Sequence, residues 1–303
     1  MVNDGSIKSV NEFLEQVNGL KDMGKDEEVF FRGISTEKYG LKENGVDENK
    51  PKIYRDGYIE HENEIINDTI AYNHEYFKNC KTAIEKLELL QHYGIPTRLL
   101  DITRNPLVAL YFACLPENKD GYGKDKEANG EVILYQMKRK DIKYNDSDTV
   151  SILSNLAFMP GDFNLNIEEG EKLEGNGNYK KLIHQICSEK SYFESCIKEE
   201  HLDDCVLCVI PNLNNKRIIA QQGAFLLYGM HDKIKKEPSR IGGKKYKYIS
   251  CNKIIINGSN KETIIRDLAE LGISKEVLFP ELENYISVIE KKYKLINRVD
   301  LTK

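Results

Sequence analysis

The sequence predicts an α+β fold, in which one mixed domain holds a mostly antiparallel sheet flanked by helices. Two observations lead to this prediction. Short apolar runs typical of strands are spread along the whole 303-residue chain, and segments with the 3.6-residue apolar spacing of helices lie between them. Neither an internal repeat nor a low-complexity linker divides the chain into separate parts. We therefore expect one domain rather than two.

The N-terminal part is predicted to hold one helix and one strand. Residues 6–19 place their apolar side chains on one helical face, and Ser6 or Asp4 is expected to cap the helix. That face consists of Val10, Phe13, Leu14 and Val17. The run EVFFRG at 28–33 predicts a strand that stops at Gly33, and a polar loop follows it.

Three further helices are predicted before the centre of the chain. Residues 58–79 and 81–92 show helical apolar spacing, which a Gly-Ile-Pro turn then interrupts. Residues 105–115 predict a buried helix with Pro106 in its first turn, where a missing N–H costs little. A polar loop leads from this helix to a predicted strand at 131–136.

The second half of the chain begins with an irregular segment. Residues 141–180 are polar, rich in Asn and Gly and weakly periodic, so we expect an insertion or a mobile lid. The remaining predicted elements are strands at 205–210, 224–228 and about 253–256, then helices at 261–272 and 281–296.

Composition and charge exclude several classes of protein. The chain has 44 Lys and Arg against 49 Asp and Glu, a net charge of −5, which argues against a globally basic nucleic-acid binder. The N-terminus does not resemble a signal peptide, and no run of 18 apolar residues predicts a membrane span. We therefore expect a cytoplasmic protein that does not contact membranes.

The seven cysteines are predicted to be reduced thiols, because their number is odd and no secretion signal accompanies them. Cys205 and Cys208 have the C-x2-C spacing of zinc ligands. However, they lie in the apolar run CVLCVI, and no second pair has matching spacing. We expect them to pack in the core, and no metal site is predicted.

The densest polar signal is the segment QHYGIPTRLLD at 91–101. A turn that joins two helices and holds His, Arg and Asp is suited to binding an anionic ligand or to moving a proton. Its candidate residues are His92, Tyr93, Thr97, Arg98 and Asp101. A purely structural alternative stays open. In it, Asp101 caps the next helix, Arg98 pairs with Asp101, and His92 interacts with the helix dipole.

Four weaker signals lie elsewhere. Arg32 and Gly33 end an aromatic strand, where an arginine either projects toward a cleft or forms an ordinary surface ion pair. Gln221 and Gln222, before a strand, could hold an amide or base edge or simply begin the strand. Glu62 is a candidate acid or a surface charge. The run Lys233–Lys247, with seven Lys or Arg against one Glu, could contact nucleic-acid phosphates or be a solvated loop.

Four motifs resemble the FRG-domain family: FFRG at 30–33, QHYGIPTRLLDITRNPLVALYFA at 91–113, RIIAQQGAFLLYG at 217–229 and LGISKEVLFPEL at 271–282. The resemblance implies a bacterial or phage protein of an anti-phage defence or toxin system. The organisation it implies is, in order, an N-terminal helix packed on the domain (1–27), an FRG-like domain (28–283) with a polar insertion near 141–180, and a C-terminal helix and tail (284–303).

A second similarity concerns the chemistry. The segment FRGIS at 31–35 is similar to the first motif of arginine-type ADP-ribosyltransferases, in which an arginine at the end of the first strand binds a phosphate of NAD. It implies that NAD is the cofactor and that Arg32 holds its pyrophosphate. The catalytic group would be Asp101, Glu62 or His92. The Ser-Thr-Ser strand and the Glu/Gln-x-Glu turn of those enzymes are not apparent.

Three functions are carried forward. The first is an ADP-ribosyltransferase-like or NAD-consuming enzyme. The second is a nuclease or nucleic-acid-binding protein using Lys233–Lys247, Arg98 and Arg104, and the third is a non-catalytic ligand sensor in a defence system. The residues expected to bind the ligand are Arg32, Gly33, Tyr93, Thr97, Arg98 and Gln222. In all three, Arg32, His92, Arg98, Asp101 and Gln222 are predicted to converge on one cleft.

Overall fold

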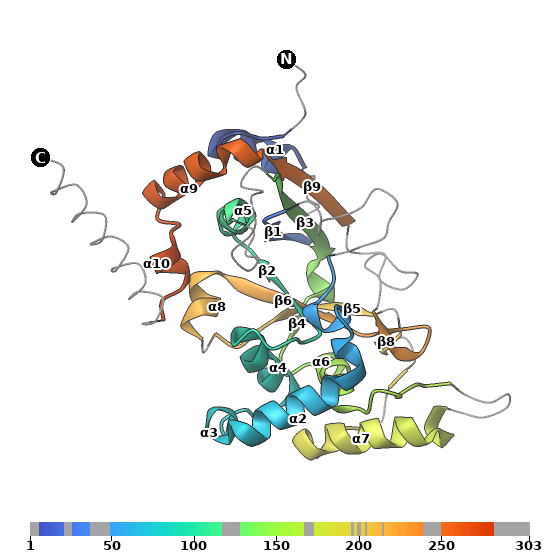
Figure 1. The fold of residues 1–303 in the computed structure, drawn as a ribbon. Helices are drawn as coiled ribbons and strands as arrows, with labels where there is room; N and C mark the ends of the chain where they lie inside the picture. Colours follow the sequence, from blue (N-terminus) through green and yellow to red (C-terminus); the bar gives the residue numbers. More distant parts are fainter. Residues whose placement is uncertain are drawn as a thin grey trace, which may run out of the picture.

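The computed structural model of the chain (Figure 1) has two groups of helices beside a long twisted sheet. The described residues are 6–20, 26–36, 49–116, 128–166, 173–194, 197–198, 201–203, 205–213, 215–238 and 250–281. Within them the main sheet has seven strands in the order β4-β5-β6-β2-β1-β3-β9. Every neighbouring pair is antiparallel except β4 and β5, so the predicted α+β class with a mostly antiparallel sheet is confirmed.

The strands are β1 (Glu27–Ile34), β2 (Leu99–Thr103), β3 (Gly130–Lys138), β4 (Lys143–Tyr144), β5 (Val206–Ile210), β6 (Gly223–Tyr228) and β9 (Ser250–Ile256), with β7 (Met230–His231) and β8 (Ile234–Pro238) in a separate hairpin. The predicted strands match β1, β3, β5, β6 and β9. Sequence reasoning missed β2, which lies inside the segment interpreted as a turn between helices. Its residues are buried except Asp101, because Leu99 packs in the core on one face of the sheet and Leu100 and Ile102 pack in the core on the other face.

The α-helices are α1 (Val10–Leu20), α2 (Glu62–Tyr72), α3 (His74–Phe77), α4 (Ala83–His92), α5 (Pro106–Cys114), α6 (Asp148–Asn155), α7 (Gly177–Glu189), α8 (Lys216–Ala220), α9 (Lys261–Glu270) and α10 (Lys275–Leu278). Among the residues that the structure describes, no helix is long and apolar enough to cross a membrane.

The ends of the predicted helices have local causes. Helix α1 begins only after Ser9, whose hydroxyl accepts a hydrogen bond from the Glu12 N–H, so Ser6 does not cap it; Asp4 lies outside the described residues. The helix expected over 58–79 is broken at Asn73, because its Nδ2 and its backbone N–H both bond to carbonyls of the preceding turn. Of the helix expected over 281–296, the structure describes residue 281 alone.

Two other segments differ from the predictions. Residues 141–180 contain α6 and the first part of α7, and α6 is buried almost throughout, so the expectation of a mobile lid is wrong there. The weak apolar periodicity hid α6 because Ser151, Ser154 and Asn155 are buried along with its apolar residues. The basic run was expected to be a loop, but residues 234–238 form β8; residues 239–247 lie outside the described part.

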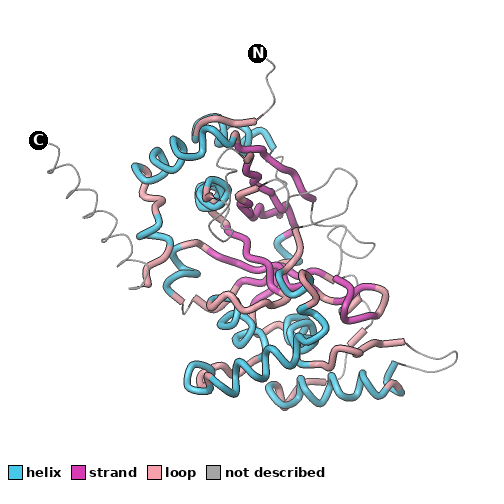
Figure 2. Tube along the Cα trace, in the orientation of Figure 1, coloured by secondary structure: helices cyan, strands magenta, loops and turns pink. Residues whose placement is uncertain are grey.

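The two faces of the sheet are covered differently. One face packs as a single core under the segment 53–59, through residues such as Phe30, Ile102 and Leu226. On the other face there are two cores. Helices α1, α5 and α9 cover β1, β3 and β9, whereas α2, α4, α6 and α7 cover β2, β5 and β6. Figures 1 and 2 show the two helical groups at opposite ends of the molecule, with the strands running between them.

The two halves of the sheet meet at a narrow junction. Strands β1 and β2 share one paired position, Phe31 opposite Thr103, whereas β1 and β3 are paired over eight positions. In this antiparallel register Arg32–Ile34 would pair with Leu100–Ile102, and these pairs are missing from the ladder. This opening lies between the two helical cores, and it is where the candidate site is found.

Candidate functional site

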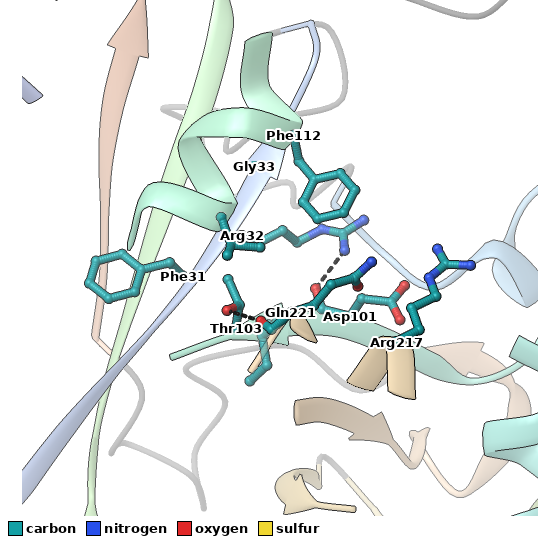
Figure 3. Close-up of a pocket in the computed structure, with 10 residues that line it drawn as sticks. Phe31, Arg32, Gly33, Asp101, Thr103, Phe112, Arg217 and Gln221 are labelled. Atoms are coloured by element: carbon teal, nitrogen blue, oxygen red, sulfur yellow. Dashed lines mark hydrogen bonds between the residues drawn. The ribbon is translucent and has the colours of Figure 1, made fainter. Parts of the chain in front are cut away.

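A pocket of about 230 Å³ occupies the opening beside the β1–β2 junction. It is lined by Phe31, Arg32, Gly33, Asp101, Ile102, Thr103, Val108, Phe112, Arg217 and Gln221. Figure 3 shows Arg32 reaching below Phe112 toward Asp101, with Arg217 on the far side of Asp101. Three segments that are distant in sequence therefore form the walls: the end of β1, the strand β2 with α5, and the helix α8.

Arg32 is held by two hydrogen bonds. Its Nε donates to Asn49 Oδ1 at 2.8 Å, and its Nη1 donates to the backbone carbonyl of Asp101 at 2.7 Å. Asn49 is anchored in turn by donating to the hydroxyl of Tyr135. A guanidinium has five N–H donors, and the described residues supply no acceptor for the other three. The side chain is therefore fixed in orientation and still able to bind an anion.

Gly33 lets β1 lie directly against α5. A Cβ at this position would come 1.8 Å from the Ala109 carbonyl oxygen and 2.7 Å from the Ala113 nitrogen. Helix α5 itself begins with Pro106 at its first turn, and Asn105 Oδ1 accepts from the Leu107 N–H at 2.9 Å. The cap of α5 is thus Asn105, and the structural alternative that assigned this role to Asp101 is wrong.

The Asp101 carboxylate is exposed in the pocket, and a short relay orients it. Its Oδ2 accepts from Gln91 Nε2 at 2.8 Å, and Gln91 Oε1 accepts from the Thr97 hydroxyl at 2.7 Å. Thr97 is completely buried, so it supports Gln91 and does not reach a ligand. This corrects its assignment as a ligand-binding residue.

A second, smaller pocket of about 70 Å³ adjoins the first, and the two share Asp101, Ile102, Arg217 and Gln221. Glu88 and His92 from α4 line the smaller one. Burial raises the pKa of Glu88 to about 7, although the hydrogen bond from Asn145 opposes the change. Burial and the nearby Arg217 lower the pKa of His92, and Glu281, 3.8 Å from its Nε2, acts in the opposite direction. Glu88, with a pKa of about 7, is therefore a group beside the main pocket that can exchange a proton near neutral pH.

Gln221 was singled out from the sequence together with Gln222, whereas Arg217 was noted only as part of the motif at 217–229. Arg217 lies over the ring of Phe279, 4.7 Å from its centroid, and Gln221 Nε2 donates to the Leu278 carbonyl at 3.0 Å. Both are in the motif at 217–229: Arg217 lies on α8, and Gln221 is the residue that caps the C-terminal end of this helix. The motif at 217–229 was therefore the available signal for both residues.

Glu62, Arg98 and Lys235 form a buried ionic cluster away from both pockets. Arg98 Nε lies 2.9 Å from Glu62 Oε1, its Nη2 lies 2.5 Å from Oε2, and Lys235 Nζ lies 3.1 Å from Oε2. All three side chains are completely buried. Burial by itself would raise the pKa of Glu62, but the two cations hold it below its usual value.

This cluster corrects several predictions. Glu62 cannot be the catalytic acid of the pocket, and Arg98 neither binds a ligand there nor pairs with Asp101. Because Arg98 and Lys235 are completely buried, they cannot contact the phosphates of a nucleic acid. From the sequence, Arg98 was expected to act near Asp101 because the two residues are close in the chain. Its actual partner, Glu62, lies 36 positions earlier, and no spacing pattern connects the two.

Tyr93 and Gln222 lie outside the pockets. Tyr93 is 58% exposed, and its ring packs edge-on against His92 and Tyr76. Gln222 is exposed, with a left-handed φ of 46°, and its backbone carbonyl accepts from the Arg104 N–H at 3.1 Å. The structure therefore brings together Arg32, Gly33, Asp101 and His92 but not Arg98 or Gln222, and Gln221 takes the place predicted for Gln222.

Cys205 and Cys208 are buried in cores on opposite faces of the sheet, as alternation along β5 requires, so they do not form a metal-ligand pair. Across the described residues, no group of three or more His, Cys, Asp or Glu side chains could hold a metal ion.

Comparison with known proteins gives one family. Residues 27–121 match the model of the FRG domain, a region that runs from β1 past α5 and contains Arg32, Gly33, His92 and Asp101. Neither the curated proteins nor the solved structures yield a match.

Proposed function

Because the chain carries an FRG domain over residues 27–121, we propose that the function of this domain lies in the two joined pockets and that their ligand is NAD. The protein would then be an ADP-ribosyltransferase-like or NAD-consuming enzyme, with NAD as a substrate. The observation that carries this proposal is the fixed guanidinium of Arg32, whose remaining donors face a pocket lined by a second arginine and a carboxylate.

Two arginines from different elements suit a pyrophosphate. Arginine binds phosphate oxygens through two parallel N–H donors, and such charge-assisted bonds are stronger than neutral ones. Arg32 is oriented by Asn49 and Asp101, and Arg217 by the Phe279 ring, so little side-chain freedom is lost on binding. At about 230 Å³ the main pocket is smaller than a typical ligand site of roughly 300–1,000 Å³. It would hold one part of a dinucleotide.

The carboxylate of Asp101 suits the other half of the chemistry. Cleavage of the bond between nicotinamide and ribose develops positive charge on the sugar, and a carboxylate held in place beside it stabilises that charge. Asp101 is the exposed carboxylate on the floor of the main pocket, and Gln91 fixes its orientation. With Glu62 buried in an ion cluster, Asp101 is the remaining carboxylate among the catalytic candidates named from the sequence.

Calorimetric titration with NAD tests the proposal. We expect saturable binding by the wild-type protein, at least tenfold weaker binding by Arg32→Ala, and unchanged binding by Arg266→Ala. Arg266 is a suitable control because its side chain lies on α9 and bonds to Thr263. Chromatography of the reaction mixture should show release of nicotinamide. A folded wild-type protein that does not bind NAD would overturn the proposal, and binding without release would favour a ligand sensor.

A defence or toxin role is part of the same proposal and has its own test. Expression of the wild-type protein should arrest bacterial growth, and Arg32→Ala or Asp101→Ala should relieve the arrest at equal protein level. Growth arrest of equal strength in all three strains would contradict an enzymatic origin of toxicity.

A further inference from the structure

The smaller pocket is lined by several polar and ionisable side chains. It measures about 70 Å³, and its lining includes Glu88, Gln91, His92 and Arg217 as well as apolar residues from β6. A water molecule takes about 30 Å³ of liquid volume and needs two to four polar partners. The pocket therefore has room for roughly two waters and the polar groups to hold them, and it opens beside Asp101 at the wall it shares with the main pocket.

Glu88 is placed to receive a proton from that water. It lies three and four positions before Gln91 and His92 on α4, so the three side chains share one face of the helix. The residue is 8% exposed, and its Oε1 accepts from Asn145 Nδ2 at 3.0 Å. The described residues contain no further hydrogen-bond partner for it. Its other oxygen is thus available to a molecule in the pocket.

Asn145 suits a group that changes its protonation state. Its Oδ1 is buried and has no partner among the described residues, while its Nδ2 donates to Glu88. An amide in this position donates to a carboxylate and, after rotation by half a turn, accepts from a carboxylic acid. The same side chain can therefore satisfy Glu88 in both forms.

We infer that the smaller pocket holds the water consumed in the reaction and that Glu88 is its general base. The inference rests on the proposed function. The water oxygen bonds to the ribose carbon while the bond from that carbon to the nicotinamide nitrogen breaks, and the electron pair of that bond stays on nicotinamide. One water proton passes to the Glu88 carboxylate and then to solvent, and the other remains on the new hydroxyl. The products are ADP-ribose, nicotinamide and a proton.

The charges around Glu88 agree with this role. Burial and Glu85 on the same helix both raise its pKa. His92 lies one turn further along α4, and Asp101 and Arg217 line the same pocket. The packed helix α6 carries one ionisable residue, Asp148, and that residue pairs with Lys190 at 2.7 Å. A base is most effective when its pKa lies near the working pH, and Glu88, at about 7, meets this condition.

The test compares wild type with Glu88→Gln, which keeps the shape of the side chain and the bond from Asn145. Glu270→Gln on the exposed end of α9 is the control. With NAD in ¹⁸O-labelled water, wild type and the control should form labelled ADP-ribose at a rate that rises with pH through about 7. Glu88→Gln should bind NAD with unchanged affinity, lose at least about 100-fold in rate, and lose the dependence on this pH range.

A second readout does not depend on activity. In ¹³C-glutamate-labelled protein, one carboxyl resonance should titrate near pH 7 and disappear in Glu88→Gln. Absence of that resonance, or an unchanged pH–rate profile in the variant, would overturn the role of Glu88 alone. ADP-ribose attached to a macromolecule in place of free ADP-ribose would overturn the water acceptor and leave the proposed function standing. Wild-type protein that neither binds nor cleaves NAD would remove both proposals.

Discussion

The Nη1 of Arg32 lies 2.7 Å from the backbone carbonyl oxygen of Asp101, across the point where β1 and β2 separate. At this point a regular sheet would pair the carbonyl with a backbone N–H of the neighbouring strand. The arginine side chain supplies that donor, so the opening in the sheet does not leave the carbonyl unpaired. The same hydrogen bond orients the guanidinium. One contact therefore both satisfies the carbonyl and positions the side chain that is proposed to bind an anion.

Arg32→Lys should therefore weaken NAD binding almost as much as Arg32→Ala. A lysine ammonium is a point charge on a flexible stem and cannot bond to Asn49, the Asp101 carbonyl and a phosphate in one plane. We expect at least a tenfold rise in Kd measured by calorimetry. Arg266→Lys, on the outside of α9, should leave Kd unchanged. Full affinity in Arg32→Lys would show that charge alone matters and that the planar fork does not.

Arg98→Met is predicted to damage the fold and not the ligand site directly. It would leave Glu62 completely buried, with Lys235 as its remaining cation. Removing one partner of a buried ion pair costs about 3–5 kcal/mol of unfolding free energy, which urea denaturation would measure. Since the pKa of Glu62 is lowered in the folded state, its contribution to stability should be present above its unfolded pKa and lost as the pH falls through the folded value.

Substitutions at Arg98 and at Arg32 are expected to have different effects, the first on stability and the second on NAD binding. Arg98→Met should lower the urea midpoint, while the fraction that remains folded binds NAD with wild-type affinity. The reverse pattern, normal stability with lost binding, would mean that Arg98 reaches the ligand after all. Arg266→Met provides the surface reference, for which a change within about 0.5 kcal/mol is expected.

Glu88 should make stability depend on pH in the opposite direction. Its pKa is about 7 in the folded state against 4.5 as the reference, so the folded protein binds this proton more tightly than the unfolded chain. The contribution is fully present below pH 4.5 and is lost as the pH rises to about 7 and above. The total loss is about 3 kcal/mol.

Comparison with Glu88→Gln isolates this contribution from the other titrating groups. The difference in unfolding free energy between the variant and wild type should grow from pH 4.5 to pH 8 in favour of the variant. A difference that stays constant over this range would mean that Glu88 titrates at its ordinary pKa.

Much of the fold was accessible from the sequence because it depends on local patterns. Alternation and apolar spacing predicted β1, β3 and α5 to within a few residues, and the Pro106 position was predicted for the right reason. The strand β2 was missed because Pro96 and the polar residues before it have the composition of a turn. Its strand character comes from being enclosed between β1 and β6, which is a tertiary effect.

The candidate site was partly predictable for a similar reason. Arg32, Asp101 and His92 stand out locally, at the ends of elements or in a polar turn. Arg98 stands out equally, yet its partner Glu62 comes from a helix 36 positions earlier, and no spacing rule connects them. Glu88 could not be singled out, since its altered pKa comes from burial on a helix face that looks ordinary in sequence.

Gly33→Ala is expected to affect both stability and binding, since Gly33 lies against α5 and also lines the main pocket. The added Cβ would meet the Ala109 carbonyl oxygen at 1.8 Å, and this oxygen belongs to backbone, so α5 or β1 must move. Overpacking of this kind typically costs about 1–3 kcal/mol, and a shift of β1 would also displace Arg32. Gly19→Ala on α1 is the matched control: no atom lies within 4 Å of its Cβ, and alanine in a helix should add about 0.5–1 kcal/mol. Urea denaturation and NAD titration of both variants would check this, and equal stability of the two would show that α5 does not pack on β1 as closely as this geometry requires.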